Sequence, residues 1–117
     1  MCPALVAQAK TVQRDARTRG EVVPRLVIVT LDPWRDTPSR LPSLAESWQL
    51  GEDASVLSGD PDAVDAVLDA YQVPRERDAT TGQVAHPALV YVLDARGTLA
   101  FASSGDARTL RALLARL

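Results

Sequence analysis

The sequence predicts an α/β fold in which helices and strands alternate along the chain. Apolar residues recur at helical spacing in four segments, and two continuous runs rich in Val, Ile and Leu have the length of buried strands. Residues that favour turns (Pro, Gly and Asp) separate these segments. The length suffices for one hydrophobic core, so we expect residues 1–117 to form a single domain.

The helical segments have start and stop signals. Pro3 is favourable as a first helical residue, and Gly20 ends that helix. Thr37-Pro38 and Asp60-Pro61 each place a capping residue before a proline at the first helical position. The predicted helices cover about residues 3–19, 38–48, 61–71 and 110–117.

The strands are predicted from apolar runs of strand length. Residues 26–31 are rich in β-branched side chains, which predicts a strand buried on both faces and favours a parallel sheet. Residues 88–93 form a second buried strand, and a short turn joins it to residues 98–102 in a hairpin. A short strand is expected at residues 54–57, and the charged segment 74–84 is expected to be a loop.

Composition and charge exclude several classes of function. The net charge is −2 and there is no basic face, which argues against a nucleic-acid partner. No apolar run approaches the ~18 residues that a membrane span needs, and no signal peptide is visible. The single cysteine excludes an internal disulfide in the chain as given.

The single cysteine and the single histidine are the first candidates for chemistry. Cys2 stands at the start of a predicted helix, where the positive end of the helix dipole favours a reactive thiolate. His86 follows a polar loop and precedes a strand, which places it at a sheet end that a ligand can reach. The alternatives are an inert buried cysteine and a loop histidine bonded to a backbone carbonyl. Together, a thiolate and an imidazole suit a soft metal or thiol redox chemistry.

The densest polar motif is Asp-Pro-Trp-Arg-Asp-Thr-Pro, which directly follows the first predicted strand. Sites of α/β proteins lie at the carboxyl ends of strands, so Asp32 could hold a nearby histidine or tune a thiol. Arg35 could pair with Asp36. The alternative is local: the Asp and Thr side chains satisfy free N–H groups of the next helix, and Trp34 packs against that helix instead of touching a partner.

The order helix–strand–helix–strand–helix–loop–strand–strand–helix is the order of a thioredoxin fold after its active-site strand. Within it, the sequence resembles the Sco/SenC family of copper-binding, thioredoxin-like proteins. The resemblance lies in a strand followed by Asp-Pro-x-Arg-Asp-Thr-Pro, a Leu-x-Gly segment with a later Ala-Tyr-x-Val, and a histidine in register before Val-Leu-Asp. These segments are Leu26–Pro38, Leu57–Val73 and His86–Gly97, and the resemblance covers residues 2–117.

The resemblance implies a copper site. In that family the ligands are the two cysteines of Cys-Pro-x-x-Cys-Pro and a histidine. Cys2-Pro3 matches the second Cys-Pro, so Cys2 and His86 would be two of three copper ligands, with Asp32 in a supporting role. Two thiolates and one imidazole suit Cu(I) and also accommodate Cu(II). Such proteins are implicated in maturing the copper centre of cytochrome c oxidase, usually tethered to a membrane.

The sequence also departs from the family pattern. The first cysteine of the motif would lie upstream of Met1. Ala85 and Pro87 replace a frequent Asp and Ser around the histidine, which removes a carboxylate partner of the imidazole and stiffens the following backbone. We expect a thioredoxin-like fold that lacks the N-terminal strand or strands before the Cys motif, through a start placed too late or as a true fragment. As given, the chain is expected to bind copper weakly.

Three functional hypotheses follow. The first is a copper metallochaperone for cytochrome c oxidase assembly, with an oxidase subunit or another copper or thiol protein as partner. It would act on the periplasmic side of the bacterial cytoplasmic membrane, attached through an anchor absent here. The second is a thiol-disulfide oxidoreductase of the same fold, with Cys2 as its catalytic residue. The third, if no upstream cysteine exists, is a non-catalytic interaction domain.

Overall fold

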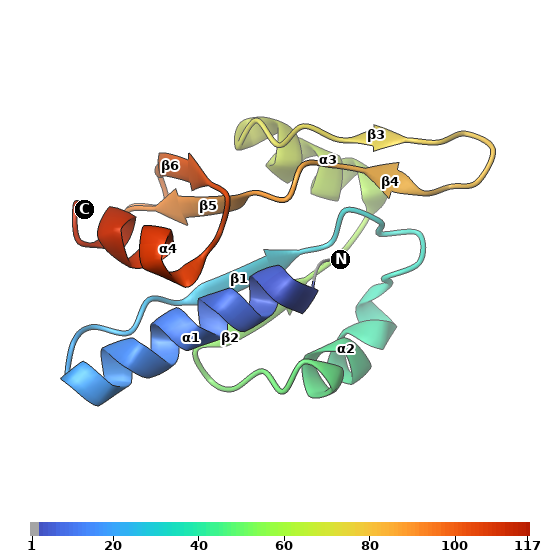
Figure 1. The fold of residues 1–117 in the computed structure, drawn as a ribbon. Helices are drawn as coiled ribbons and strands as arrows, with labels where there is room; N and C mark the ends of the chain where they lie inside the picture. Colours follow the sequence, from blue (N-terminus) through green and yellow to red (C-terminus); the bar gives the residue numbers. More distant parts are fainter. Residues whose placement is uncertain (1–2) are drawn as a thin grey trace. The chain divides into compact units, whose positions relative to one another are not determined.

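The structure is a computed structural model that describes residues 3–117 (Figure 1). The described chain divides into two compact units. The continuous unit is Val27–Pro87, and the discontinuous unit combines the segment that ends at Leu26 with Ala88–Leu117. That residues 1–117 form a single domain stays a prediction.

The discontinuous unit is built around an apolar core. Helices α1 and α4 contact each other, and strands β5 and β6 form an antiparallel hairpin in which Val92 lies opposite Phe101. Val12 of α1, Val92 of β5 and Leu110 of α4 are only 4–5% exposed and form the centre of this core. The elements are α1 Pro3–Arg19, β5 Val90–Leu93, β6 Leu99–Ser103 and α4 Ala107–Leu114.

Local sequence explains the ends of these helices. Gly20 follows α1 at a φ of +70°, a left-handed conformation that glycine adopts without strain. Asp106 caps α4, because its carboxylate accepts the Thr109 N–H at 2.9 Å. Hydrogen bonds from the Thr109 side chain and backbone hold the pKa of Asp106 below its usual value.

The continuous unit carries two short sheets. Strands β1 and β2 pair, and the Thr30 N–H donates to the Leu57 carbonyl at 3.0 Å where both strands end. Strands β3 and β4 form an antiparallel hairpin with Arg77 opposite Val84. The elements are β1 Leu26–Val29, the 3-10 turn η1 Pro38–Arg40, α2 Leu41–Ser47, β2 Ala54–Leu57, α3 Pro61–Ala70, β3 Glu76–Arg77 and β4 Val84–Ala85.

The predicted α/β alternation is confirmed, but both strands expected to be buried are less covered than predicted. In β5, which begins at Val90, Val92 is the one buried residue. All four helices and the strands predicted at residues 54–57, 88–93 and 98–102 are present. The helix at 3–19 and the strand at 54–57 have the predicted ends, and the other elements have shifted ends. The prediction of a strand buried on both faces at residues 26–31 is wrong. Strand β1 ends at Val29, and Val27 is 48% exposed. Among the described residues β1 pairs with β2 alone, so neither strand is the interior strand of a wider sheet.

The prediction that residues 74–84 are a loop is wrong in part, because β3 and β4 pair within them. Asp78 closes the turn between the two strands: its Oδ1 accepts the backbone N–H groups of Thr80 at 2.7 Å and Thr81 at 3.0 Å. The bonds from Thr81 and Thr80 lower the pKa of Asp78. An aspartate that bonds the backbone two residues ahead is a recognised turn former, and this signal was present in the sequence.

Arg75 joins the start of the hairpin to α3. Its guanidinium donates to Asp69 Oδ1 at 2.8 Å and to Asp65 Oδ1 at 3.1 Å, and both carboxylates stand on that helix. Hydrogen bonds to Asp69 and Asp65 raise the pKa of Arg75. The hairpin therefore leaves α3 from a fixed point.

Candidate metal centre

An open cavity of about 240 Å³ lies in the continuous unit, between the turn after β1 and strand β4. Asp32 and Asp36 line it from the turn, and Val84 and His86 line it from β4 and the residues that follow. Two of the three predicted site residues, Asp32 and His86, therefore lie at one cavity. The third, Cys2, lies outside the described residues.

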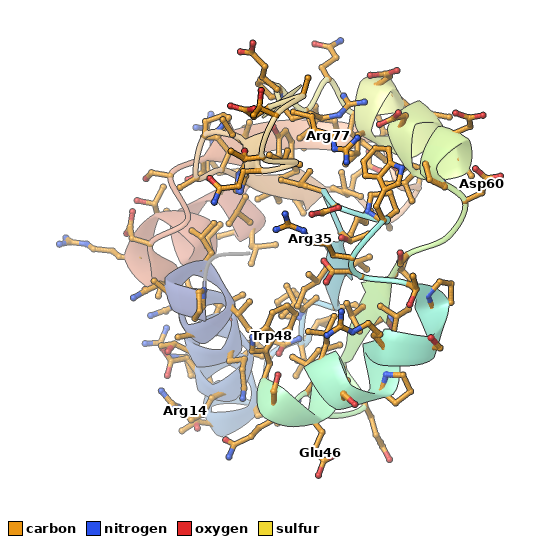
Figure 2. All side chains as sticks on the ribbon, turned by 90° about the vertical axis from the view of Figure 1, so that its right-hand side faces the viewer. Arg14, Arg35, Glu46, Trp48, Asp60 and Arg77 are labelled. Carbon is orange, nitrogen blue, oxygen red and sulfur yellow. The ribbon has the colours of Figure 1, made fainter. Side chains whose placement is uncertain are left out.

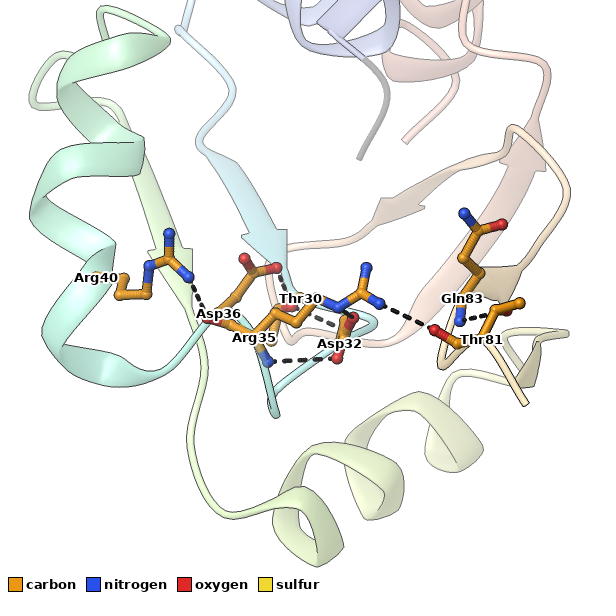
Figure 3. A network of polar contacts seen from close by, with 7 residues as sticks. All are labelled: Thr30, Asp32, Arg35, Asp36, Arg40, Thr81 and Gln83. Atoms are coloured by element: carbon orange, nitrogen blue, oxygen red, sulfur yellow. Dashed lines mark hydrogen bonds and ion pairs between the residues drawn. The ribbon is translucent and has the colours of Figure 1, made fainter. Parts of the chain in front are cut away.

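Thr30 organises the turn that carries the two carboxylates. Its side chain is completely buried, and its Oγ1 donates to Asp36 Oδ2 at 2.7 Å (Figure 3). The same oxygen accepts the Asp32 backbone N–H at 2.9 Å. The hydroxyl thus acts as both donor and acceptor. Because leaving a buried hydroxyl unpaired costs free energy, these two bonds fix where Asp32 and Asp36 lie. Sequence reasoning missed Thr30, which reads only as part of an apolar strand.

Asp32 has Arg35 as its ionic partner. Arg35 Nε lies 3.4 Å from Asp32 Oδ2, and the side chain of Asp32 is 18% exposed against 59% for Arg35. The suggested pairing of Arg35 with Asp36 does not form, because the Asp36 carboxylate accepts the Thr30 hydroxyl instead. Asp32 is thus an oriented and partly covered carboxylate at the cavity.

Arg35 also reaches across to the hairpin. Its Nη2 donates to the Thr81 carbonyl at 3.1 Å, as Figure 3 shows. One guanidinium therefore connects the turn that bears Asp32 with the hairpin that leads to His86. Thr81 is the second residue that sequence reasoning missed, because a backbone acceptor leaves no trace in residue type.

The local alternative for this motif is only partly correct. Thr37 has the extended backbone of a capping residue, but its side chain makes no capping bond. Its Oγ1 lies 3.1 Å from Ser39 Oγ instead. Pro38 still opens the 3-10 turn η1, so the proline fixes where the helix starts. The carboxylates of the motif do not cap this helix: Asp32 pairs with Arg35, and Asp36 accepts the Thr30 hydroxyl.

His86 is exposed and directly follows β4. Its Nδ1 lies 3.0 Å from the Pro87 carbonyl oxygen. A carbonyl only accepts, so this bond requires a proton on Nδ1 and leaves Nε2 with its lone pair in the neutral imidazole. No described residue hydrogen-bonds to Nε2. The loop histidine bonded to a backbone carbonyl is therefore present, and that bond selects the tautomer that a ligand histidine would use.

Trp34 is 46% exposed and does not simply pack against the next helix. The Arg77 guanidinium lies over its ring, 4.1 Å from the ring centroid. This cation–π contact is a second connection between the turn after β1 and the hairpin.

Among residues 3–117, the groups at the cavity that could bind a metal are the imidazole of His86 and the carboxylates of Asp32 and Asp36. Within residues 3–117 there is no group of three or more His, Cys, Asp or Glu side chains placed to hold a metal ion. One imidazole and two carboxylates held by other partners make a weak site for a soft metal, so a soft-metal site here would need a ligand from outside the described residues. That Cys2 is this ligand stays a prediction.

A comparison of sequences decides the family. The SCO1/SenC family profile matches residues 1–116. The chain belongs to the SCO1/SenC family. No protein of curated function matches the sequence significantly.

Solved structures with SCO1/SenC names share the fold. A SCO1/SenC family lipoprotein from Bacillus anthracis gives a TM-score of 0.77 at 20% identity, over 97% of this chain and 71% of that one. Yeast Sco1 with copper bound gives 0.78 at 20% identity, over 98% of this chain and 66% of that one. Apo Sco1 from Thermus thermophilus gives 0.72 at 24% identity, over 99% and 71%. The predicted thioredoxin-like α/β class is confirmed.

The part of this SCO1/SenC chain that the structure describes contains no helix long and apolar enough to cross a membrane.

Proposed function

We propose that this SCO1/SenC chain binds a copper ion as its cargo through Cys2 and His86 and delivers it for assembly of the copper centre of cytochrome c oxidase. The observation that carries the proposal is the state of His86. Its ring borders the cavity that Asp32 also lines, and its Nδ1 is bonded to Pro87, which leaves Nε2 for a metal. The family and the copper found in yeast Sco1 give further support.

The donor set fits copper by its chemistry. Imidazole suits copper in both oxidation states, and a thiolate favours Cu(I). His86 would supply its Nε2 and Cys2 its sulfur, and a second cysteine upstream would complete a three-ligand site. Asp32 would act beside the metal without ligating it, because its carboxylate is held by Arg35.

The partner would be a subunit of the oxidase or another copper or thiol protein. By the same family argument, the protein would act on the periplasmic side of the bacterial cytoplasmic membrane. A measurement of where the native protein fractionates, with the membrane or in the periplasmic extract, tests this placement.

Thiol-disulfide exchange is the second candidate, because Cys2 immediately precedes α1 in the sequence. The amino end of a 17-residue helix favours a thiolate, which is the nucleophile in this chemistry. A thiolate would attack a disulfide of the partner, form a mixed disulfide and release the partner's thiolate. A second thiol, such as that of a dithiol reductant, would then attack the mixed disulfide and release the Cys2 thiolate.

Copper titration followed by absorption spectroscopy separates the candidates. Copper binding predicts a thiolate-to-Cu(II) charge-transfer band that is lost in both Cys2→Ser and His86→Ala. Asp32→Asn should keep the band and weaken copper affinity by about tenfold, as loss of a group supporting a ligand does. Asp62→Asn, an exposed aspartate on α3, is the control and should change nothing.

Exchange activity predicts a different pattern. Turnover of a dithiol or disulfide substrate would survive His86→Ala and disappear in Cys2→Ser. A charge-transfer band that is unchanged in His86→Ala would contradict copper binding through His86. Absence of both band and turnover would favour the non-catalytic interaction domain.

A further inference from the structure

Arg77 is a positively charged group with no acidic partner among the described residues. It stands on β3 and is exposed, and no carboxylate of residues 3–117 lies within ion-pair distance of it. The contact that holds it is the Trp34 ring, 4.1 Å from its guanidinium carbon. A guanidinium stacked on an indole keeps its N–H donors at its edge, where they can still meet an acceptor.

A second guanidinium lies beside it. Arg35 and Arg77 project from the turn after β1 and from β3 (Figure 2). Each Nη2 atom lies 3.5 Å from the point that a Cβ of residue 82 would occupy, so the two groups converge on Gly82. Arg35 forms an ion pair with Asp32, whereas no carboxylate within residues 3–117 forms one with Arg77. The guanidinium of Arg77 can therefore still accept a carboxylate partner.

The surroundings favour a carboxylate over a doubly charged anion. Glu76 and Asp78 flank Arg77 in sequence, and these negative charges disfavour a doubly charged anion more than a singly charged one. A single carboxylate matches the edge of one guanidinium with two parallel hydrogen bonds. The exposed Trp34 ring offers an apolar surface to the methylene groups of a Glu or Asp side chain. Trp and Arg together are also the residues most often found at the energetic centres of protein interfaces.

We propose that Arg77 and Trp34, with Arg35 beside them, form a docking point for an acidic side chain of a partner protein. Arg35 borders both the cavity proposed to hold copper and the docking point. A partner bound at the docking point would therefore lie next to the proposed cargo. The inference rests on the proposed function only for the kind of partner, a protein that exchanges copper with this chain.

An NMR titration of the metal-free protein tests the docking point without copper. The probe is the peptide acetyl-Gly-Glu-Gly-amide, its Gln counterpart is the neutral comparison, and ionic strength is held constant. The Glu peptide should shift the Trp34 indole N–H and the Arg77 Nε–H resonances, and the Gln peptide should not. Arg77→Gln should weaken binding of the Glu peptide by about tenfold, the effect of losing a charge-assisted pair.

Arg116→Gln is the matched control. It removes the same charge from the other cation–π pair of the described residues, where Arg116 lies 5.7 Å from the Phe101 ring centroid. It should leave binding unchanged, as measured in variants whose thermal transitions match the parent. Equal weakening by both variants would reduce the effect to overall charge and overturn the proposal.

Two further outcomes would overturn the proposal. Equal binding of the Gln peptide would mean that the carboxylate is not recognised. Inorganic phosphate that binds as tightly as the Glu peptide would indicate a general anion site. Because copper is absent throughout, loss of carboxylate binding and loss of copper binding are separate results, and either can fail alone.

Discussion

Different interactions lie at the centre of each of the two compact units of the chain. The discontinuous unit has an apolar centre in which Val12, Val92 and Leu110 meet from two helices and one strand. The continuous unit has a polar centre at the cavity, where the completely buried Thr30 connects to Asp36 and Asp32. The continuous unit also buries Val64 and Leu68 of α3, so the contrast is between the apolar cluster of one unit and the polar turn at the cavity of the other.

This difference explains how a unit with short sheets can still hold the side chains of the site in fixed positions. Apolar contacts are numerous and tolerate small shifts, whereas each hydrogen bond of the polar centre fixes one atom against another. Arg35 and Arg77 then connect that centre to the hairpin that leads to His86. The site therefore depends on a few directional contacts, and single substitutions should separate the two kinds of stabilisation.

The largest effect on stability is expected in the discontinuous unit. Leu110→Ala should lower the free energy of unfolding by about 3 kcal/mol, because it removes a side chain that is 4% exposed and leaves a cavity. Denaturant-induced unfolding measures the loss. Leu117→Ala is the control, since Leu117 is 56% exposed, and should cost much less. A similar cost for both would mean that the core is not where the structure places it.

A smaller loss is expected when the polar centre loses its hydroxyl. Thr30→Val keeps the shape of the side chain and should cost about 2 kcal/mol, because the Asp32 N–H and the Asp36 carboxylate lose their partner. Thr30→Ser keeps the hydroxyl and is the control. Ser103→Ala in the other unit should cost less than Thr30→Val, since Ser103 Oγ makes only a 3.4 Å bond to Gly105. The reverse order would remove the proposed contrast.

The connection to the hairpin should affect exchange more than stability. Arg35→Gln should cost at most about 1 kcal/mol, because the Arg35 side chain is 59% exposed and its ion pair with Asp32 is screened by solvent. It should nevertheless speed hydrogen exchange of the β3–β4 backbone amides, since the bond to Thr81 is lost. Arg96→Gln, on the β5–β6 turn, is the comparison. Unchanged protection of the hairpin would show that Arg35 does not hold it.

The smallest effect concerns pH. Asp78 and Asp106 both have a lowered pKa in the folded chain, so each stabilises the fold above the ordinary carboxyl pKa of about 3.9 and loses that contribution as the pH falls through its folded pKa. Carboxyl NMR titrations should place both midpoints below the ordinary value. Asp78→Asn should remove the acid-dependent loss of hairpin protection and leave α4 unaffected. An ordinary pKa for Asp78 would contradict the turn geometry.

Most elements of the discontinuous unit could be predicted from the sequence, because periodic patterns of apolar residues indicate which face of a helix or strand is buried. The spacing of apolar residues located α1 and α4, and the run at residues 88–93 with its following turn located the β5–β6 hairpin. The same reasoning predicted too much burial for β1, because an apolar run indicates a strand but not how many neighbouring strands cover it. Among the described residues β1 pairs with β2 alone, and Val27 is exposed.

The polar site was predictable only in part. Asp32 and His86 could be singled out, because one follows a strand and the other is the single histidine, and both border the cavity. The roles of Thr30 and Thr81 could not be read, because they depend on a buried hydroxyl and on a backbone carbonyl. The contact of Arg77 with Trp34 joins residues far apart in sequence, and such long-range pairs have no local pattern.

X-ray absorption at the copper edge tests the central claim most directly. On the copper-loaded parent protein, the account predicts scattering from sulfur together with the multiple-scattering pattern of one imidazole. In His86→Ala the imidazole pattern should vanish, and in Cys2→Ser the sulfur contribution should fall. Identical spectra for the parent protein and His86→Ala would contradict the account, because copper would then be held without the histidine.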